Sequence, residues 1–312
     1  MSTDTAAPAP PASSPDRRLA WAVLARAALT TPTAVEHLLA DTNTDVEDAA
    51  HRLGDAGETF SVPADLRERA VGDLDRAEAV GARLLTREEF EWPTARLAGL
   101  GTPGVRGRMP VALWLRGPAR LNAFSGHSVA VIGARACTQY GNSVAHDFAG
   151  HFAERGWTVL SGGAFGIDAT AHQAALAQEG ATVAVMATGI DRYYPAGNQT
   201  LLDRIAERGL LVSEYPPGET ARRDRFLERN RLVAALAAGV VVIEAGHRSG
   251  TLDTVGWAHR LARPVFATPG SVYSAASAGV HDLLRQRRTA LVTHPEQVID
   301  AITRPNPTGL TH

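Results

Sequence analysis

Short, continuous apolar runs recur along the second half of the chain, with polar or helical stretches between them. Six such runs cover residues 129–132, 159–160, 183–186, 210–212, 240–243 and 265–267. The intervening stretches have helical spacing of apolar positions, near residues 141–155, 168–179, 198–208, 226–238 and 251–262. Strands that are apolar on both faces and alternate with helices predict an α/β fold with a doubly wound, mostly parallel sheet.

The first half of the chain has a different pattern. Residues 17–85 show helical spacing and no strand pattern, whereas the apolar run 111–115 predicts a strand at the edge of the sheet. A last helix is expected over 295–302. The predicted organisation is therefore a disordered tail (1–15), a helical N-terminal domain (16–85), a connector with an edge strand (86–128), the doubly wound domain (129–303) and a C-terminal tail (304–312).

Composition excludes several kinds of chemistry. All 31 basic residues among the 312 are arginine, so a Walker A loop and a Schiff-base lysine are excluded. The single cysteine, Cys137, excludes an internal disulfide and a multi-cysteine metal site, which fits a reducing cytoplasm. No apolar run reaches the length of a membrane span. The net charge of −2 means that any nucleic-acid site must be a local patch.

A glycine-rich turn lies between the second apolar run and the helix that follows it. It contains Ser161, Gly162, Gly163 and Gly166. Successive backbone N–H groups in such a turn, together with a helix N-terminus, favour an anion such as phosphate. A tight turn without a ligand is the alternative. Asp168 is expected as a residue of the first helical turn rather than as a catalytic base.

Further candidates gather where the other predicted strands end. We expect phosphate contacts from Gly133, Arg135, Arg229, Asn230, Arg231, Ser249, Gly250 and Thr251, and base stacking on Tyr193, Tyr194 and Phe226. Each of these also has a plainer interpretation, as a loop-packing aromatic, a helix cap or a solvated charged face. Because ligands of such sheets bind at the carboxyl ends of the strands, we expect these residues to line one crevice.

Enzyme motifs are mostly absent. The turn after residue 132 lacks the G-x-G-x-x-G pattern, and no nucleophile elbow or H-E-x-x-H motif occurs. Glu214 and Glu244 each end a predicted strand, so a pair of carboxylates suited to hydrolysis remains an alternative.

Taken together, the motifs resemble the DNA-processing protein A (DprA, or Smf) family of bacteria. The resemblance covers about residues 90–300, and residues 17–85 are similar to the family's SAM-like helical N-terminal domain. The segments that carry it are 131–135, 140–141, 161–168, 171–172, 189–191, 194–195, 213–214, 226, 229–231, 244–245, 249–251 and 269–270. Many members have a C-terminal winged-helix domain, which we do not expect in this sequence.

The resemblance implies an extended Rossmann-like domain that binds single-stranded DNA and loads the RecA recombinase onto it during natural transformation. It also implies a cytoplasmic homodimer that acts by binding, without covalent chemistry or a cofactor. Two alternatives differ in class. One is a Rossmann-like enzyme that cleaves nucleoside monophosphates, which would use Glu214 or Glu244. The other is an interaction protein whose crevice holds no ligand.

Overall fold

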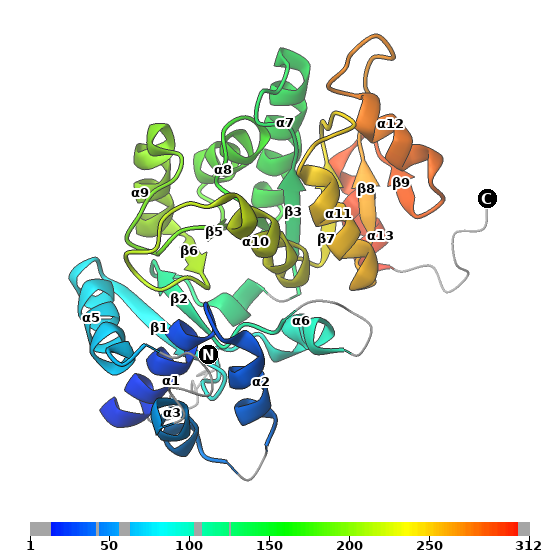
Figure 1. Ribbon diagram of the computed structural model, residues 1–312. Coiled ribbons are helices and arrows are strands. Elements are labelled where there is room, and N and C mark those ends of the chain that lie inside the picture. The colour runs from blue at the N-terminus through cyan, green and yellow to red at the C-terminus, as the bar shows by residue number, and fades with distance from the viewer. Residues whose placement is uncertain (1–13, 42–43, 56–62, 103–107, 125, 305–312) are drawn as a thin grey trace, which may run out of the picture.

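The computed structural model describes residues 14–41, 44–55, 63–102, 108–124 and 126–304 (Figure 1). The two predicted tails lie outside these ranges, apart from Ser14, Pro15 and Arg304. The α-helices are α1 (Pro15–Ala27), α2 (Pro32–Ala40), α3 (Val46–Asp55), α5 (Leu66–Ala79), α6 (Thr94–Leu97), α7 (Gln139–Glu154), α8 (Ile167–Ala177), α9 (Gln199–Arg208), α10 (Arg223–Leu236), α11 (Thr251–Arg260), α12 (Ala278–Arg285) and α13 (Pro295–Thr303). Short 3-10 helices are η1 (Ala98–Gly101), η2 (Leu121–Phe124) and η3 (Ala196–Asn198).

The strands form one mixed sheet with the order β1-β2-β6-β5-β4-β3-β7-β8-β9 in the described part of the chain. They are β1 (Ala82–Thr86), β2 (Ala112–Arg116), β3 (Ser128–Ile132), β4 (Thr158–Ser161), β5 (Thr182–Met186), β6 (Leu210–Ser213), β7 (Gly239–Val242), β8 (Val265–Ala267) and β9 (Thr289–Leu291). All pairs from β6 to β9 are parallel, and β1 and β2 are antiparallel additions beside β6. The prediction of a doubly wound, mostly parallel sheet is confirmed.

The order of the strands reverses its direction at β3. From β3 the chain builds outward through β4, β5 and β6, and then returns to place β7 on the other side of β3. The loops that leave β3 and β7 therefore diverge to opposite faces of the sheet. Such a switch point opens a ligand site at the carboxyl ends of these strands.

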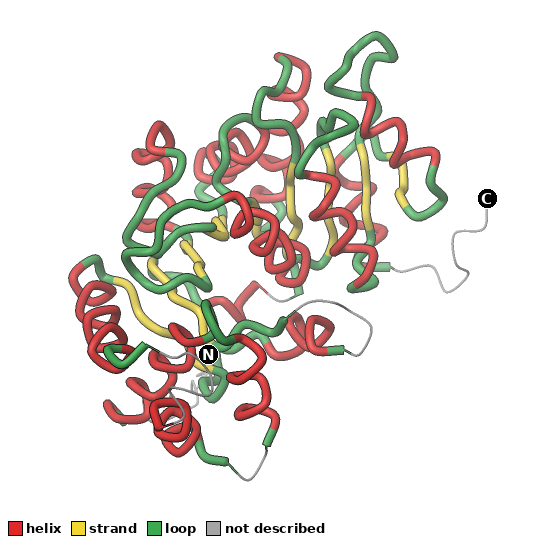
Figure 2. The backbone as a smooth tube through the Cα atoms, in the orientation of Figure 1, coloured by secondary structure: helices red, strands yellow, loops and turns green. Residues whose placement is uncertain are grey.

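Helices cover both faces of the sheet (Figure 2). Because side chains alternate between faces along a strand, Ala130 and Ile132 pack with α10 and α11, whereas Val129 and Val131 pack with α7 and α8. The helices α1, α3 and α5 pack in a third cluster with residues of β1, β2 and β6. The parallel strands are thus buried on both faces, which explains their continuous apolar runs.

Two expectations about the first half of the chain are wrong. The structure has a strand at 82–86, where the sequence pattern shows none. The run 111–115 contributes β2, which is not an edge strand because β1 pairs with its outer side. Among the described residues, no helix is both long and apolar enough to cross a membrane.

Candidate nucleic-acid interface

The loops after β3 and β4 lie in direct contact at the switch point. Gly166 precedes α8 with φ +74° and ψ −127°, a conformation that glycine alone adopts easily. A Cβ atom there would lie 2.4 Å from the carbonyl oxygens of Ala134 and Arg135. A Cβ on Gly133 would meet Ile167 at 2.6 Å. These glycines therefore serve the close approach of two loops to each other.

The backbone N–H groups of the glycine-rich turn already have an anionic partner within the chain. The carboxylate of Asp168 accepts hydrogen bonds from the N–H groups of Gly162 (3.1 Å) and Ala164 (3.3 Å). Burial raises the pKa of Asp168 above its ordinary value, although the charge of Arg229 acts in the opposite direction. The anion-binding character of the turn was predicted from the sequence. The structure shows that an internal carboxylate uses these two N–H groups.

Arg229 contacts the same turn from the protein interior and is only 5% exposed. Its guanidinium Nη1 donates to the carbonyl oxygen of Gly162 at 2.7 Å and to that of Val185. A Cβ on Gly162 would lie 2.1 Å from this guanidinium, so the glycine makes room for the arginine. Burial lowers the pKa of Arg229, and the nearby Asp168 partly offsets this. Arg229 therefore holds the turn in place rather than facing solvent.

Arg231 and Asn230 are buried as well. Both Glu214 oxygens accept from Nη2 of Arg231 at 2.7 Å, and its Nε donates to the carbonyl oxygen of Arg108 at 2.9 Å. Burial acts to lower the pKa of Arg231, but the Glu214 carboxylate raises it overall. The amide of Asn230 donates to Asp253 at 3.2 Å. These side chains connect α10 to its neighbours, a role that the sequence analysis did not assign to them.

His172 lies fully buried in α8, behind the turn. Its Nδ1 lies 2.7 Å from the hydroxyl oxygen of Thr182, and that hydroxyl donates to the carbonyl oxygen of Val159 at 2.9 Å. The hydroxyl must therefore accept from Nδ1, so the ring is the neutral Nδ1–H tautomer. Burial, followed by the charge of Arg229, lowers the pKa of His172 to about 3.

His172 is expected to make the fold sensitive to acid. In the unfolded chain the imidazole protonates near its ordinary pKa of 6.5, whereas in the folded protein it stays neutral to about pH 3. The stability that it contributes is therefore complete above pH 6.5 and declines as the pH falls. The slope is about 1.4 kcal/mol per pH unit in the free energy of unfolding.

Urea unfolding at several pH values between 4 and 7 checks this. His172→Asn keeps an N–H donor near the position of Nδ1 but has no basic nitrogen. In the variant, the free energy of unfolding should fall less steeply with decreasing pH, by about 1.4 kcal/mol per pH unit, the contribution of one proton. Asp168 titrates in both proteins and does not contribute to this difference. Equal slopes in the two proteins would show that His172 protonates normally when folded.

An exposed aromatic and arginine cluster lies at the carboxyl ends. The rings of Tyr194 and Phe226 are 5.2 Å apart, and the guanidinium of Arg135 lies over the Phe226 ring at 5.1 Å. Tyr194 is 42% exposed and Phe165 is 48% exposed. We call Arg135, Phe165, Tyr194 and Phe226 the carboxyl-end surface. Phe165 was passed over as a stacking residue, although an aromatic among the small residues of a glycine turn was a usable signal.

Tyr193 points away from this surface. Its ring packs against the cluster that contains the N-terminal helices, and its hydroxyl donates to Asp203 and accepts from Arg116. Burial raises the pKa of Tyr193 to about 12. Of the two predicted stacking tyrosines, Tyr194 alone belongs to the carboxyl-end surface.

Of the remaining predicted residues, some form hydrogen bonds that join neighbouring loops, and others are exposed. Ser161 is buried and its hydroxyl donates to the carbonyl oxygen of Val131 at 2.8 Å. The hydroxyl of Thr251 donates to the carbonyl oxygen of Gly133 at 3.0 Å and accepts from Ser249 at 2.9 Å, which ties the β7 loop to the β3 loop. Gly250 is exposed, and a Cβ there would meet nothing within 4 Å.

The two candidate carboxylates do not form a pair. β6 and β7, which Glu214 and Glu244 follow, are separated by β5, β4 and β3, which corresponds to roughly 19 Å at the spacing of neighbouring strands. Glu214 is bound to Arg231, and Glu244 accepts from the N–H group of Thr138 at 2.9 Å and from its hydroxyl at 2.5 Å. The described residues contain no cluster of three or more His, Cys, Asp or Glu arranged to hold a metal ion.

Sequence comparisons identify related proteins. Residues 83–303 match the family model of DNA recombination-mediator protein A. A putative DNA processing protein DprA of Mycobacterium tuberculosis is 46% identical over 239 residues, which cover 75% of this chain and 61% of the relative. The DNA processing protein DprA of Streptococcus pneumoniae is 43% identical over 191 residues, 61% of this chain and 66% of the relative. The chain thus spans about three fifths to two thirds of the length of these relatives.

Solved structures agree with the sequence comparisons. The X-ray structure of DNA processing protein A from Streptococcus pneumoniae superposes with a TM-score of 0.68 and 30% identity, over 92% of this chain and 98% of that one. DNA processing protein A from Helicobacter pylori, a structure described for its single-stranded DNA binding mode, gives a TM-score of 0.62 and 27% identity, over 72% and 96% of the two chains.

Proposed function

This chain belongs to the family of DNA recombination-mediator protein A, which includes the DprA and Smf proteins, and from that premise we propose that it binds single-stranded DNA across the carboxyl-end surface. The observation that carries the proposal is the stack of exposed Arg135, half-buried Phe226 and exposed Tyr194 at the switch point. A guanidinium attracts phosphates, and exposed aromatic faces stack on bases of any sequence. Phe165 extends the apolar part of this surface.

The buried polar residues have a supporting part in this function. Arg229 and Asp168 fix the glycine-rich turn, and Thr251 joins the β7 loop to the β3 loop. They position Arg135 and Phe165 without contacting DNA themselves. The backbone of Gly133 and Gly250 remains a proposed place for phosphate contacts, whereas Gly163 is buried and its carbonyl oxygen accepts from Asn198. Because backbone contacts carry no base information, we expect little sequence preference.

Two partners complete the proposal. The protein hands the bound strand to the RecA recombinase during natural transformation, and it acts as a homodimer. Family membership supports both statements, and relatives named DNA processing protein share most of this domain. The hand-over to RecA depends on DNA binding, because a mediator that holds no strand has nothing to pass on.

Arg135→Ala is expected to weaken the binding of a labelled oligo-dT by about tenfold, as the loss of a charge-assisted phosphate contact predicts. The slope of log affinity against log salt should fall by about 0.7, the value for one phosphate of a single strand. Phe226→Leu keeps apolar bulk but removes the ring, and should cost about 5- to 150-fold. Fluorescence anisotropy across a salt series, with the duplex alongside, measures these effects.

Arg208→Ala is the matched control. Arg208 is exposed in the last turn of α9. This helix ends just before β6 begins, so Arg208 lies at the amino ends of the strands, away from the carboxyl-end surface. This variant should bind oligo-dT within twofold of the natural chain. If Arg135→Ala and Arg208→Ala weaken binding equally, the DNA does not occupy the carboxyl-end surface.

A further inference from the structure

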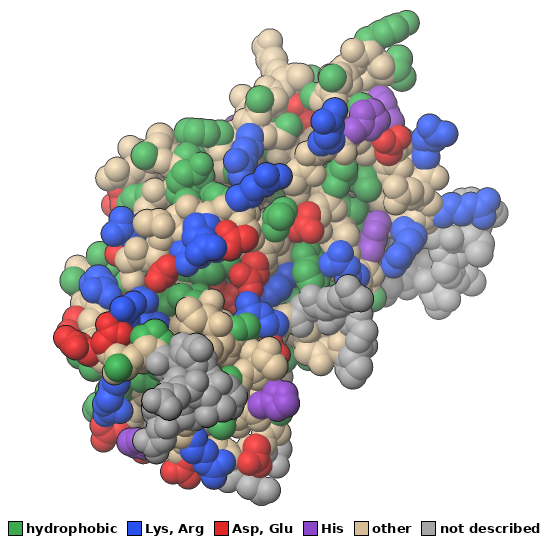
Figure 3. All heavy atoms as spheres, in the orientation of Figure 1, with side chains coloured by type: hydrophobic (Ala, Val, Ile, Leu, Met, Phe, Trp, Pro, Cys, Tyr) green, Lys and Arg blue, Asp and Glu red, His purple; other side chains and the backbone are tan. Residues whose placement is uncertain are grey.

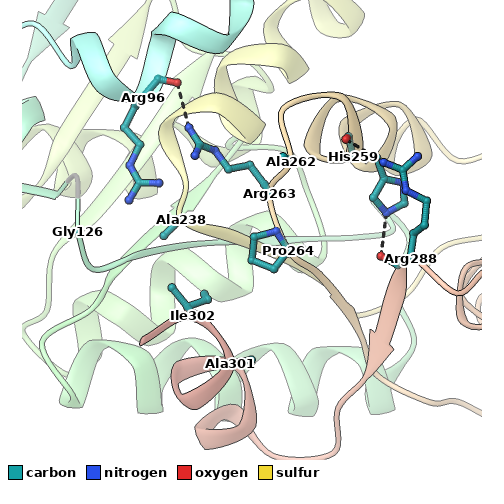
Figure 4. A pocket seen from close by; sticks show the side chains of 10 residues that line it. All are labelled: Arg96, Gly126, Ala238, His259, Ala262, Arg263, Pro264, Arg288, Ala301 and Ile302. Carbon is teal, nitrogen blue, oxygen red and sulfur yellow. Dashed lines mark hydrogen bonds between the residues drawn. The ribbon is translucent and has the colours of Figure 1, made fainter. Parts of the chain in front are cut away.

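A cavity of about 610 Å³ opens at the amino ends of the strands, which lie opposite their carboxyl ends and the carboxyl-end surface (Figure 4). Ala238, Pro264 and Arg288 line it, and they directly precede β7, β8 and β9. Arg96 of α6 and the end of α13 close its other sides. The parallel strands between these two ends are three to five residues long, so roughly 10–16 Å of sheet separates the cavity from the proposed DNA site.

The charged side chains that line this cavity are all basic. Arg96, Arg263 and Arg288 contribute guanidinium groups, and none of the lining residues is an aspartate or glutamate. Figure 3 shows basic and histidine side chains gathered beside the lower end of α11, on the side of the amino ends of the strands. The cavity is therefore a local positive site in a protein of slightly negative net charge.

Arg263 is held at the cavity by backbone groups. Its Nη2 donates to the carbonyl oxygens of Arg96 (3.1 Å) and Ala235 (3.2 Å), and its buried Nε has no hydrogen-bond partner among the described residues. Burial lowers the pKa of Arg263, and it also lowers that of Arg96, where the neighbouring charge of Arg263 adds to the effect. Two like charges thus share a low-dielectric wall, an arrangement that an anion stabilises.

The turn after α11 fixes this geometry. The N–H group of Arg263 bonds to the carbonyl oxygen of Ala258 at 2.8 Å, and that of Ala262 bonds to His259 at 3.3 Å, with Ala262 at φ 53°. This pattern is a Schellman motif, which sets the direction of the chain as it leaves a helix. Arg263 is consequently placed by regular backbone hydrogen bonds rather than by a variable loop.

Arg288 forms the opposite wall with His259. Its Nη2 donates to the carbonyl oxygen of His259 at 3.1 Å, and His259 Nε2 lies 3.2 Å from the carbonyl oxygen of Arg288. Burial and the charge of Arg288 lower the pKa of His259, so the imidazole is neutral at pH 7 and its Nε2 is the donor. The positive charge of the cavity therefore comes from the arginines, and it does not change near neutral pH.

We propose that this cavity is a second anion site, which binds a phosphate compound against the guanidinium groups of Arg96, Arg263 and Arg288 that line it. Guanidinium groups match the oxygens of phosphate in geometry and charge. The volume lies in the range of small-molecule sites, which allows more than a single phosphate, and Ala238, Pro264 and Ile302 supply an apolar floor. The phosphate belongs either to a free phosphate compound or to the backbone of a DNA strand.

Titration calorimetry of the full chain with inorganic pyrophosphate at low salt tests the site. Arg288→Glu reverses an exposed charge of the cavity, and Arg263→Gln removes the charge of the buried wall while keeping a donor. Each should weaken pyrophosphate by about tenfold or more, the effect of losing one bond to a charged group. Arg287→Glu is the matched control, because Arg287 is the exposed neighbour of Arg288 and does not line the cavity. It should leave affinity within twofold.

The source of the phosphate is decided with oligo-dT. In an Arg135→Ala background, which weakens the proposed DNA site, Arg288→Glu should lower the residual affinity further if the cavity takes a DNA backbone. If the cavity takes a free phosphate compound, oligo-dT affinity stays the same while pyrophosphate binding is lost.

No saturable pyrophosphate binding, or an equal loss in Arg287→Glu, would overturn the proposal. Tighter binding of oligo-glutamate than of pyrophosphate would also overturn it, in favour of an acidic peptide.

Discussion

Replacing Arg229 by alanine is expected to lower the free energy of unfolding by about 3–5 kcal/mol, because a buried charged group is removed from its partners. The carbonyl oxygens of Gly162 and Val185 lose their donor, and the buried carboxylate of Asp168 loses the nearby positive charge. A cavity also remains beneath the glycine-rich turn. This effect is a large fraction of the roughly 5–15 kcal/mol by which folded domains are stable.

Urea unfolding measures the loss, with Arg223→Ala as the matched control. Arg223 lies in the same helix but is exposed, so its removal should change the free energy of unfolding by less than about 0.5 kcal/mol. Oligo-dT binding by the Arg229 variant should fall for two reasons only. Part of the protein is unfolded, and in the folded part the glycine-rich turn is less firmly held. A fully stable Arg229→Ala protein with weakened DNA binding would instead make this arginine a direct DNA contact.

The contrast between these two arginines marks a limit of sequence analysis. Arg229 and Arg231 were interpreted as phosphate contacts, yet both are buried, as is Arg225 in the same helix. Their partners lie on other elements, such as the backbone of β5 and Glu214 after β6. Composition and helical spacing report the charge of such residues. Their burial depends on tertiary contacts, which a local pattern does not contain.

The parallel part of the sheet was predictable, and its antiparallel edge was not. Each run from 129 to 267 is apolar on both faces, as buried parallel strands require. The run that forms β2 has the same continuous character, and Leu113, Trp114 and Leu115 are fully buried. This was a sign of an interior strand. The strand that covers it, β1, is five residues long and begins only three residues after α5 ends, which hid its pattern.

The glycine-rich turn was partly predictable too. Its position between β4 and α8 followed from the glycines, and the helix N-terminus suggested that its N–H groups would face an anionic group. The identity of that group did not follow from them. Asp168 lies in the first turn of α8, and the same position serves equally for a dipole-stabilising residue and for the internal ligand of the turn. Only the three-dimensional path of the loop distinguishes them, since it brings two N–H groups to one carboxylate oxygen.

Replacing Gly166 by alanine is expected to lower the free energy of unfolding by about 3–5 kcal/mol, the sum of two costs. The first is backbone strain, because a side chain disfavours φ +74° with ψ −127°. The second is steric, because the new Cβ would lie 2.4 Å from two backbone carbonyl oxygens, neither of which has a flexible side chain's freedom to move. Relief requires the loops after β3 and β4 to separate, which displaces Arg135 from Phe226.

Thermal and urea unfolding of Gly166→Ala test the strain, and oligo-dT anisotropy tests its consequence for the carboxyl-end surface. Gly250→Ala is the control, because that glycine has φ −61° and open space around its Cβ position, so its stability should stay within about 0.5 kcal/mol. A Gly166 variant that remains stable but binds DNA as weakly as Arg135→Ala would show that loop contact positions Arg135 without supporting the fold. A variant unchanged in both respects would mean that the two loops do not need their close approach, and the bracing role assigned to the glycine-rich turn would be wrong.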